Sequence, residues 1–363
     1  MPRELDRREF LRQLMALSAT GAALGLTGCS RRKRRPAEMP PSTEPTAASS
    51  GAVSTAAPST SLPSAAAPAP TSPVKAAAGE EEAASATATP PGAAYLAVAH
   101  GAGADPAELT RRAIAAVGGI ERFVKSGADV IVKPNICNAY RGPEYASTTN
   151  PIVVATLVSL CLGAGAKRVR VMDYPFSGTP QEAYAKSGIE EAVKAAGGQM
   201  ELMNRLNFRA IAIPAGQAIK EWEVYNDILD ADLVINVPIA KHHGSARLTL
   251  AMKNLMGVVK DRGGMHARGL HQPIADLCSA VVPQLNVVDA IRILTANGPT
   301  GGNLDHVKQM DTIIASHDIV AADAYATTLF GKTAADIPYI VAGGEMGVGQ
   351  ADLSKIKIEE IAV

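Results

Sequence analysis

The chain has 363 residues, of which 47% are hydrophobic, so it is long enough to bury a substantial core. Its 35 basic and 35 acidic residues give a formal net charge of zero, which argues against nucleic acid as a partner. The four cysteines contain no Cys-x-x-Cys pair, so the sequence predicts neither an iron–sulfur cysteine motif nor a disulfide framework.

The amino-terminal segment has the pattern of an export signal. Residues 6–12 match the twin-arginine pattern, and a short apolar stretch follows over residues 14–26. The sequence Leu-Thr-Gly-Cys that ends at Cys29 resembles a bacterial lipobox, in which the cysteine receives a diacylglyceryl group. We therefore expect residues 1–29 to be a signal peptide that ends at a lipidated Cys29. Its partners would be the twin-arginine translocase, the lipoprotein-processing enzymes and membrane lipid.

The segment over residues 30–92 has the composition of a tether. It opens with a basic run, Arg31–Arg35, which either faces anionic lipid headgroups or is simply solvated. Ala, Pro, Ser and Thr dominate the rest, so the segment buries too little apolar surface to offset the entropy lost on ordering. We expect a disordered linker, and an exported, membrane-anchored lipoprotein that faces the periplasm or the cell surface.

Residues 93–363 have the pattern of an α/β domain. Short β-branched runs alternate with amphipathic helical stretches, which indicates a largely parallel sheet with helices on both faces. The predicted strands cover residues 129–133, 168–173, 233–237, 285–289 and 312–315. Prolines at positions 106, 151 and 273 predict helix starts, because a proline at the first helical position loses no hydrogen bond. A further helix is predicted over residues 249–256, and a long, flexible loop over residues 260–271.

Polar side chains follow four of the predicted strands. In open α/β sheets ligands bind beyond the carboxyl ends of the strands, so we expect these side chains to share one site. The residues expected to bind an anionic ligand are Lys133, Asn135, Lys241, Lys253, Asn254 and Asn297. Asp173 and Asp289 are expected to orient the reacting groups, although a single Asp at a strand end is also typical of a helix cap.

Two histidines are candidates for catalysis. Adjacent residues of an extended segment point to opposite sides, so one residue of the pair His242 and His243 should face the site, and we expect it to be His242. His266 lies in the predicted loop, which suits a lid. Both His242 and His266 are candidates for proton transfer or for binding a divalent metal. Their spacing matches no standard zinc motif, so both roles stay open.

Six motifs in order along the chain resemble an uncharacterised bacterial and archaeal family called domain of unknown function three-six-two. They are Lys133-Pro134-Asn135, Thr149-Asn150-Pro151, Asn236-Val237-Pro238, Met252–Gly257, Val288-Asp289-Ala290 and Asn297-Gly298-Pro299. The resemblance covers roughly residues 95–349 and implies an α/β domain. Some relatives carry a ferredoxin-like iron–sulfur module, but this chain lacks the cysteines of such a module.

Three functions remain open, and the sequence does not decide whether the protein is an enzyme. The leading hypothesis is an enzyme that acts on a small anionic metabolite at the carboxyl ends of the strands, with or without a divalent metal. The alternatives are a non-catalytic ligand-binding protein of the cell envelope, and an envelope redox partner of the iron–sulfur-associated family.

Overall fold

The computed structural model describes residues 92–363. The expected signal peptide, Cys29 and all but the last residue of the expected tether lie outside the described residues. Within this range no helix is both long enough and apolar enough to span a membrane.

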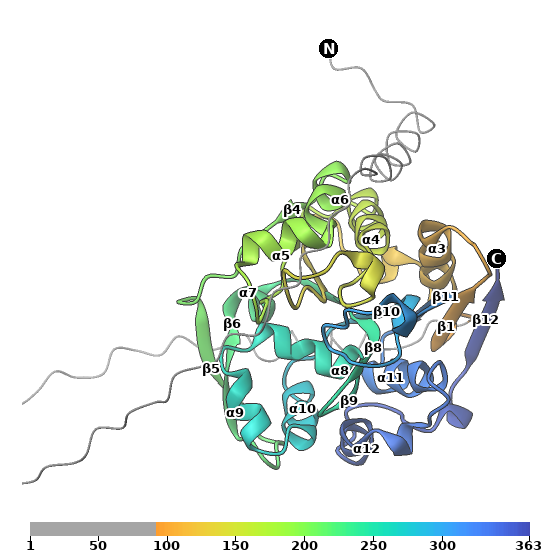
Figure 1. Ribbon diagram of the computed structural model, residues 1–363. Coiled ribbons are helices and arrows are strands. Elements are labelled where there is room, and N and C mark those ends of the chain that lie inside the picture. Colours follow the sequence, from red (N-terminus) through yellow and green to blue (C-terminus); the bar gives the residue numbers. More distant parts are fainter. Residues whose placement is uncertain (1–91) are drawn as a thin grey trace, which may run out of the picture. The chain divides into compact units, whose positions relative to one another are not determined.

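A large mixed sheet organises the described part of the chain (Figure 1). Its strands are β1 (Leu96–His100), β2 (Asp129–Pro134), β3 (Arg168–Val171), β4 (Gln199–Met200), β7 (Leu233–Val237), β8 (Ile239–His243), β9 (Arg247–Thr249), β10 (Leu285–Leu294), β11 (Val307–Ser316) and β12 (Ile358–Ala362). A separate antiparallel pair consists of β5 (Phe208–Ala212) and β6 (Glu221–Tyr225).

The sheet is largely parallel, as predicted. The main path runs in the order β12-β1-β11-β10-β7-β2-β3-β4, and β8 pairs with β10 and β9 at the side of this path. Strand β2 is parallel to both β3 and β7, and β10 is parallel to β7 and β8. Strand β11 is antiparallel to both of its neighbours, β1 and β10.

Helices cover both faces of this sheet. They are α3 (Pro106–Ala116), α4 (Pro151–Gly163), α5 (Pro180–Ser187), α6 (Ile189–Ala195), α7 (Asn226–Asp230), α8 (Ala251–Asn254), α9 (Arg262–Ala267), α10 (His271–Cys278), α11 (Ile319–Thr328) and α12 (Pro338–Glu345). Single 3-10 turns are η1 (Ile120–Arg122), η2 (Pro143–Tyr145), η3 (Leu255–Val258), η4 (Leu304–His306), η5 (Ala334–Asp336) and η6 (Leu353–Lys355).

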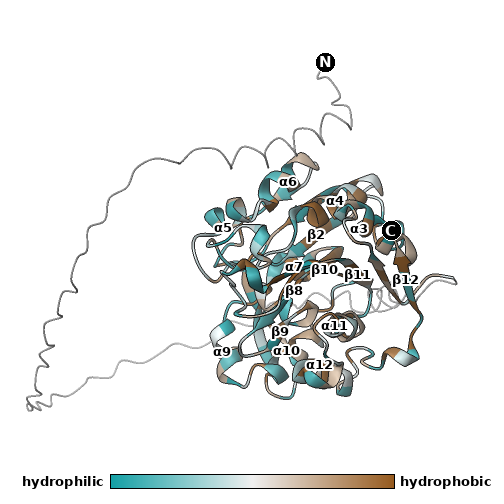
Figure 2. Cartoon of the chain, turned by 45° about the vertical axis from the view of Figure 1, so that its right-hand side comes forward, coloured by the Kyte–Doolittle hydropathy of each residue, from teal (hydrophilic) through white to brown (hydrophobic). Residues whose placement is uncertain are grey.

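The alternation of side chains along β2 divides the core into two layers. Val130 and Val132 pack with buried residues of α3, α4 and α6, whereas Ile131 packs with those of α8, α10, α11 and α12. Successive residues of a strand point to opposite faces, so a strand covered on both sides is apolar throughout. Figure 2 shows this contrast, because β2 is brown while α5, at the edge, is largely teal.

The local signals for helix starts agree with the structure at two positions. Asp105 accepts a hydrogen bond from the N–H of Ala107 (3.0 Å), and Asn150 accepts one from the N–H of Ile152 (2.9 Å), so α3 and α4 begin at the predicted prolines. The third predicted helix start lies too late in the chain, because α10 begins at His271 and Pro273 occupies its third position. Proline is tolerated there since the N–H groups of a first turn have no acceptor within the helix.

Two other segments differ from the prediction. The predicted helix over residues 249–256 begins later, since Thr249 pairs with Lys241 as part of β9, and the helix continues as the 3-10 turn η3. The predicted loop over residues 260–271 contains helix α9, which Asp261 caps by accepting from the N–H of Gly264 (2.8 Å). Residues of both segments, among them Thr249 and Arg262, line one cavity of the domain.

Candidate functional site

A cavity of about 270 Å³ lies at the carboxyl ends of β2 and β3. Side chains reach it from β2, β8, β9, α8, η3 and α9 as well as from the segments that follow β2 and β3. Its lining consists of Lys133, Asn135, Cys137, Asp173, Tyr174, Phe176, Lys241, His243, Thr249, Lys253, Asn254, Met256, Gly257, Arg262, His266 and Pro299. Four of these residues carry a cationic group, and a single one carries a carboxylate.

Lys133 and Asp173 form a buried ion pair at the base of this cavity. The Nζ of Lys133 lies 2.8 Å from Oδ1 of Asp173 and donates to Oδ1 of Asn254 and to the carbonyl of Pro134, each at 2.9 Å. The other carboxylate oxygen accepts from the N–H of Ile136 (2.6 Å). Burial lowers the pKa of Lys133, and the carboxylate of Asp173 opposes this shift. The positive charge of Lys133 is therefore balanced by a carboxylate of the protein itself.

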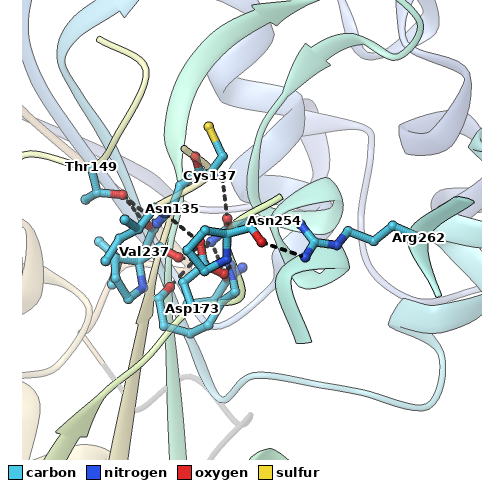
Figure 3. A network of polar contacts seen from close by, with 12 residues as sticks. Asn135, Cys137, Thr149, Asp173, Val237, Asn254 and Arg262 are labelled. Atoms are coloured by element: carbon cyan, nitrogen blue, oxygen red, sulfur yellow. Dashed lines mark hydrogen bonds and ion pairs between the residues drawn. The ribbon is translucent and has the colours of Figure 1, made fainter. Parts of the chain in front are cut away.

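Asn254 connects the strands of this network. Its Oδ1 also accepts from the amide of Asn135 (2.8 Å), and its own amide donates to Oδ1 of Asn236 (2.8 Å). Figure 3 shows Asn135, Asp173 and Asn254 close together, with Arg262 reaching toward them from α9. Asn254 thus joins Lys133, Asn135 and Asn236 in one hydrogen-bonded network.

Lys241 is held in place by three hydrogen bonds. It is 1% exposed, and its Nζ donates to Oδ1 of Asn135 (2.9 Å), to the carbonyl of Ser147 (2.5 Å) and to Sγ of Cys137 (3.2 Å). All three acceptors are formally neutral groups when Cys137 is a thiol. Among residues 92–363 no ion pair joins Lys241 to a carboxylate, so its charge is free to attract an anion.

Lys253 differs from both of these lysines. Its side chain is held in α8 and buried, and the polar contact of its Nζ is with Sδ of Met256, at 3.8 Å. Burial lowers the pKa of Lys253 to about 7, and the positive charge of Lys241 adds to this effect. Near neutral pH this amine is therefore present in both its charged and its neutral form.

His243 faces the cavity as a neutral imidazole. Its Nδ1 accepts from the N–H groups of Ser245 and Ala246, both at 3.2 Å, which assigns the ring proton to Nε2. Burial lowers the pKa of His243 to about 3, with the charges of Lys253 and Lys241 contributing. The His266 ring stacks against it with 6.4 Å between centroids, and burial lowers the pKa of His266 as well.

Arg262 closes the cavity from α9. Its guanidinium lies over the ring of Tyr174 at 4.9 Å from the centroid, which fixes the planar group against an aromatic face. Burial lowers the pKa of Arg262, but an arginine remains charged at any pH that a protein tolerates. Among the ion pairs of residues 92–363 Arg262 has no carboxylate partner, so it is a second such cation of the cavity lining beside Lys241.

Three residues that the sequence analysis assigned to the site lie elsewhere. His242 is absent from the cavity lining, and its Nδ1 accepts from the N–H of Gly298 (3.1 Å), so the residue of the pair that faces the site is His243. Asn297 is a surface residue whose amide contacts Nδ1 of His306 (3.1 Å). The pleat of β8, set by its pairing with β9 and β10, decides which histidine points inward.

Asp289 lies outside the cavity because its strand is longer than predicted. Strand β10 continues to Leu294, so Asp289 lies within it and not at its end. It accepts from the N–H groups of Asn150 (2.7 Å) and Ile291 (3.0 Å), beside a separate pocket of about 10 Å³. Burial raises the pKa of Asp289 to about 6. Its contacts are those of a structural carboxylate.

The donor set does not fit a metal held by the protein. No group of three or more His, Cys, Asp or Glu suited to a metal ion occurs in the described part of the chain. The carboxylate of the cavity is already paired with Lys133, and the cationic groups around it repel a divalent cation. His242 and His266, the two expected ligands, do not both line the cavity.

Comparison with known proteins identifies the family. Residues 130–328 match the family described as Domain of unknown function (DUF362). The chain belongs to this family. A thylakoid-associated protein of Synechocystis sp. is 28% identical over 246 residues, which cover 64% of this chain and 72% of that protein.

Two solved structures resemble the DUF362 domain distantly. The lactate racemase apoprotein from Thermoanaerobacterium thermosaccharolyticum has a TM-score of 0.42 at 13% identity, and the match covers 64% of this chain and 56% of that one. A protein from Thermotoga maritima has a TM-score of 0.36 at 12% identity, covering 63% of this chain and 60% of that one. The chain thus spans less than two thirds of either structure.

Sequence reasoning missed several cavity residues of the DUF362 domain. His243 lines the cavity, whereas the sequence favours its neighbour His242. Arg262 lies in a segment whose His and Arg content suggests a lid. Nothing in the sequence indicates that this residue lies in a helix. Gly257 was part of a noted motif, and the structure gives its reason: a Cβ there would overlap Asp173 and Lys133.

Asp323 of α11 positions the helix that carries Lys253. Its Oδ1 accepts from the N–H of Ala251 (2.6 Å) and its Oδ2 from the N–H of Met252 (2.9 Å), at the first two residues of α8. Burial raises the pKa of Asp323 to about 8. A protonated carboxyl can still accept at both of its oxygens, whereas the side-chain amide of an asparagine can accept at its single oxygen only.

Asp323→Asn is therefore expected to destabilise the domain by about 1–3 kcal/mol, because one buried N–H loses its acceptor. Urea denaturation measures the change. The matched control is Asp305→Asn, since Asp305 is an exposed acid and its loss should leave stability unchanged. Equal stability of the two variants would contradict a positioning role for Asp323.

Proposed function

We propose that the DUF362 domain of this protein binds a small anionic metabolite in the cavity and acts on it as an enzyme. The observation that carries this proposal is the charge balance of the lining. Lys241, Lys253 and Arg262 have no carboxylate partner among the ion pairs of residues 92–363, and the carboxylate of Asp173 is paired with Lys133. Buried cations without partners favour a bound anion, since its charge offsets their loss of solvation.

The groups beside these cations support an enzyme over a passive receptor. An amine that titrates near neutral pH and a neutral imidazole with its proton on Nε2 both line the cavity, as Lys253 and His243. General acid–base catalysis works best when the pKa of a catalytic group lies near the working pH. Perturbed groups that cluster in a cavity are typical of active sites.

Binding of anions to the purified full-length protein tests this proposal. Inorganic phosphate, pyruvate and citrate are titrated while thermal unfolding is followed. A bound anion at about 100 times its dissociation constant should stabilise the fold by about 2.7 kcal/mol. Lys241→Met should weaken this binding by at least about tenfold, because a buried charge is lost opposite the anion.

Lys308→Met is the matched control, since Lys308 is an exposed lysine of β11. Arg262→Gln provides a second variant at the cavity, in case Lys241→Met fails to fold. The proposal would be contradicted if no anion stabilises the wild type, or if the cavity variants and the control respond alike.

We also propose that this domain works at a membrane surface of the cell envelope, anchored through Cys29. The twin-arginine pattern and the lipobox support this proposal. Radiolabelled palmitate should enter the wild-type protein and should not enter Cys29→Ala. An unlabelled wild type, or a labelled variant, would refute the anchor.

A further inference from the structure

The cavity contains three lysines that differ in what surrounds their amines. Lys133 is paired with Asp173, and Lys241 donates to two oxygen atoms and a sulfur atom. The Nζ of Lys253 has a weak contact with the thioether of Met256. A lysine amine that is not engaged in strong hydrogen bonds keeps its lone pair available for reaction with a ligand.

The position of Lys253 is fixed although its amine is not engaged. The preceding turn is held by Asp323, the carbonyl of Met252 accepts from Sγ of Cys278 (3.7 Å), and the following residue, Asn254, is tied to Lys133 and Asn236. The helix therefore cannot move easily to find another partner for Lys253. A reactive group held in place by its neighbours is what catalysis by position requires.

The charged and titratable groups around Lys253 favour its neutral form. They come from β2, from the segments after β2 and β3, from β8 and from α9, and they are Lys133 with its partner Asp173, Cys137, Lys241, His243, Arg262 and His266. The cations raise the free energy of a protonated Lys253, while a Cys137 thiolate would act in the opposite direction. Desolvation next to other cations is a recognised way to obtain a nucleophilic lysine.

We propose that Lys253 is a nucleophile that forms an imine with small carboxylates that also carry an aldehyde or ketone. This inference rests on the proposed function, because Lys241 and Arg262 would hold the carboxylate. His243 would donate from Nε2–H to the carbonyl oxygen, since its Nδ1 is occupied by backbone N–H groups. The cavity of about 270 Å³ lies just under the range of about 300–1,000 Å³ typical of pockets for drug-sized ligands, so it suits a small substrate.

The step balances without an oxidant or reductant. The Nζ lone pair attacks the carbonyl carbon, a C–N bond forms, and the carbonyl oxygen gains a proton to give a carbinolamine. The hydroxyl then leaves as water after taking a second proton, the C–O bond breaks, and the nitrogen loses its remaining amine proton as the C=N bond forms. The two hydrogens of the neutral amine thus end in the released water.

Trapping of the imine by reduction tests the proposal. The full-length protein is incubated with glyoxylate, pyruvate, oxaloacetate or 2-oxoglutarate in the presence of cyanoborohydride, and the adduct is located by peptide mass mapping. We expect one reduced adduct on Lys253 with at least one of these acids, none in Lys253→Met, and an unchanged yield in Lys308→Met. Its formation should follow a pH midpoint near 7, whereas the ordinary pKa of a lysine is 10.5.

Two probes separate this inference from the proposed function. Acetone has a carbonyl but no carboxylate and should not label Lys253, while lactate has a carboxylate but no carbonyl and should protect Lys253 without an adduct. Stabilisation by anions without an adduct from any of the four oxo acids would overturn the imine alone. Absence of stabilisation by every anion would overturn the proposed function as well.

Discussion

Replacement of Lys133 by Met should destabilise the domain by about 3–5 kcal/mol, which is the range for removing one partner of a buried ion pair. The reason is the carboxylate of Asp173, which is 2% exposed and would keep its charge in the interior without a cation at 2.8 Å. Urea denaturation near neutral pH measures the loss. The double variant Lys133→Met with Asp173→Asn should recover part of it, because the unpaired charge is gone.

The matched control is Lys260→Met. Lys260 forms an ion pair with Glu223 at 2.6 Å, but the two side chains are 48% and 43% exposed. Exposed pairs contribute about 0–1 kcal/mol, so this variant should change little. If Lys133→Met and Lys260→Met had similar effects, the pair at the base of the cavity would not be a structural element of the site.

The architecture could be predicted because its signals are local. Val130, Ile131 and Val132 are apolar on both faces of β2, which is the pattern of a strand covered by helices on two sides. The caps of α3 and α4 depend on residues adjacent in sequence, so Asp105 and Asn150 could be recognised without the fold. Strand β1 and the edge strand β12 carried no comparable signal, since their places depend on long-range pairing.

The composition of the candidate site could be predicted better than its geometry. Lys133, Asn135, Lys241, Lys253 and Asn254 all line the cavity, although their role in binding stays a prediction. Which of His242 and His243 faces the cavity depends on the register of β8. The position of Asp289 depends on the pairing with β11, which extends β10 to Leu294. Both are properties of partner strands that lie far away in the sequence.

The contrast among the three lysines could not be predicted either. All three appear in the sequence as cations near strand ends or helices. What distinguishes them is whether a carboxylate, neutral acceptors or a thioether lies beside the amine, and this follows from how the strands are paired. An exposed lysine and a buried nucleophile look alike until the fold is known.

Lys253→Met should make the domain more stable than the wild type at about pH 6, while it abolishes the imine and weakens the binding of anions. In the wild type the pKa of Lys253 is about 7 when folded and close to its ordinary value of 10.5 when unfolded. Below both values each state binds the proton, and the folded state carries a buried charge among other cations. Between them the unfolded state binds more protons, so the free energy of unfolding rises with pH.

Methionine removes the titrating group, and the advantage of the variant should therefore be largest in acid and should vanish as the pH approaches about 10. We expect a difference of a few kcal/mol at about pH 6, because each pH unit between the two pKa values corresponds to about 1.4 kcal/mol. Urea denaturation of both proteins and of Lys308→Met over this pH range measures it. Parallel stability curves for wild type and Lys253→Met would show that the amine is not perturbed. If Lys253→Met gains stability and loses binding, Lys253 serves the function of the protein while it lowers the stability of the fold.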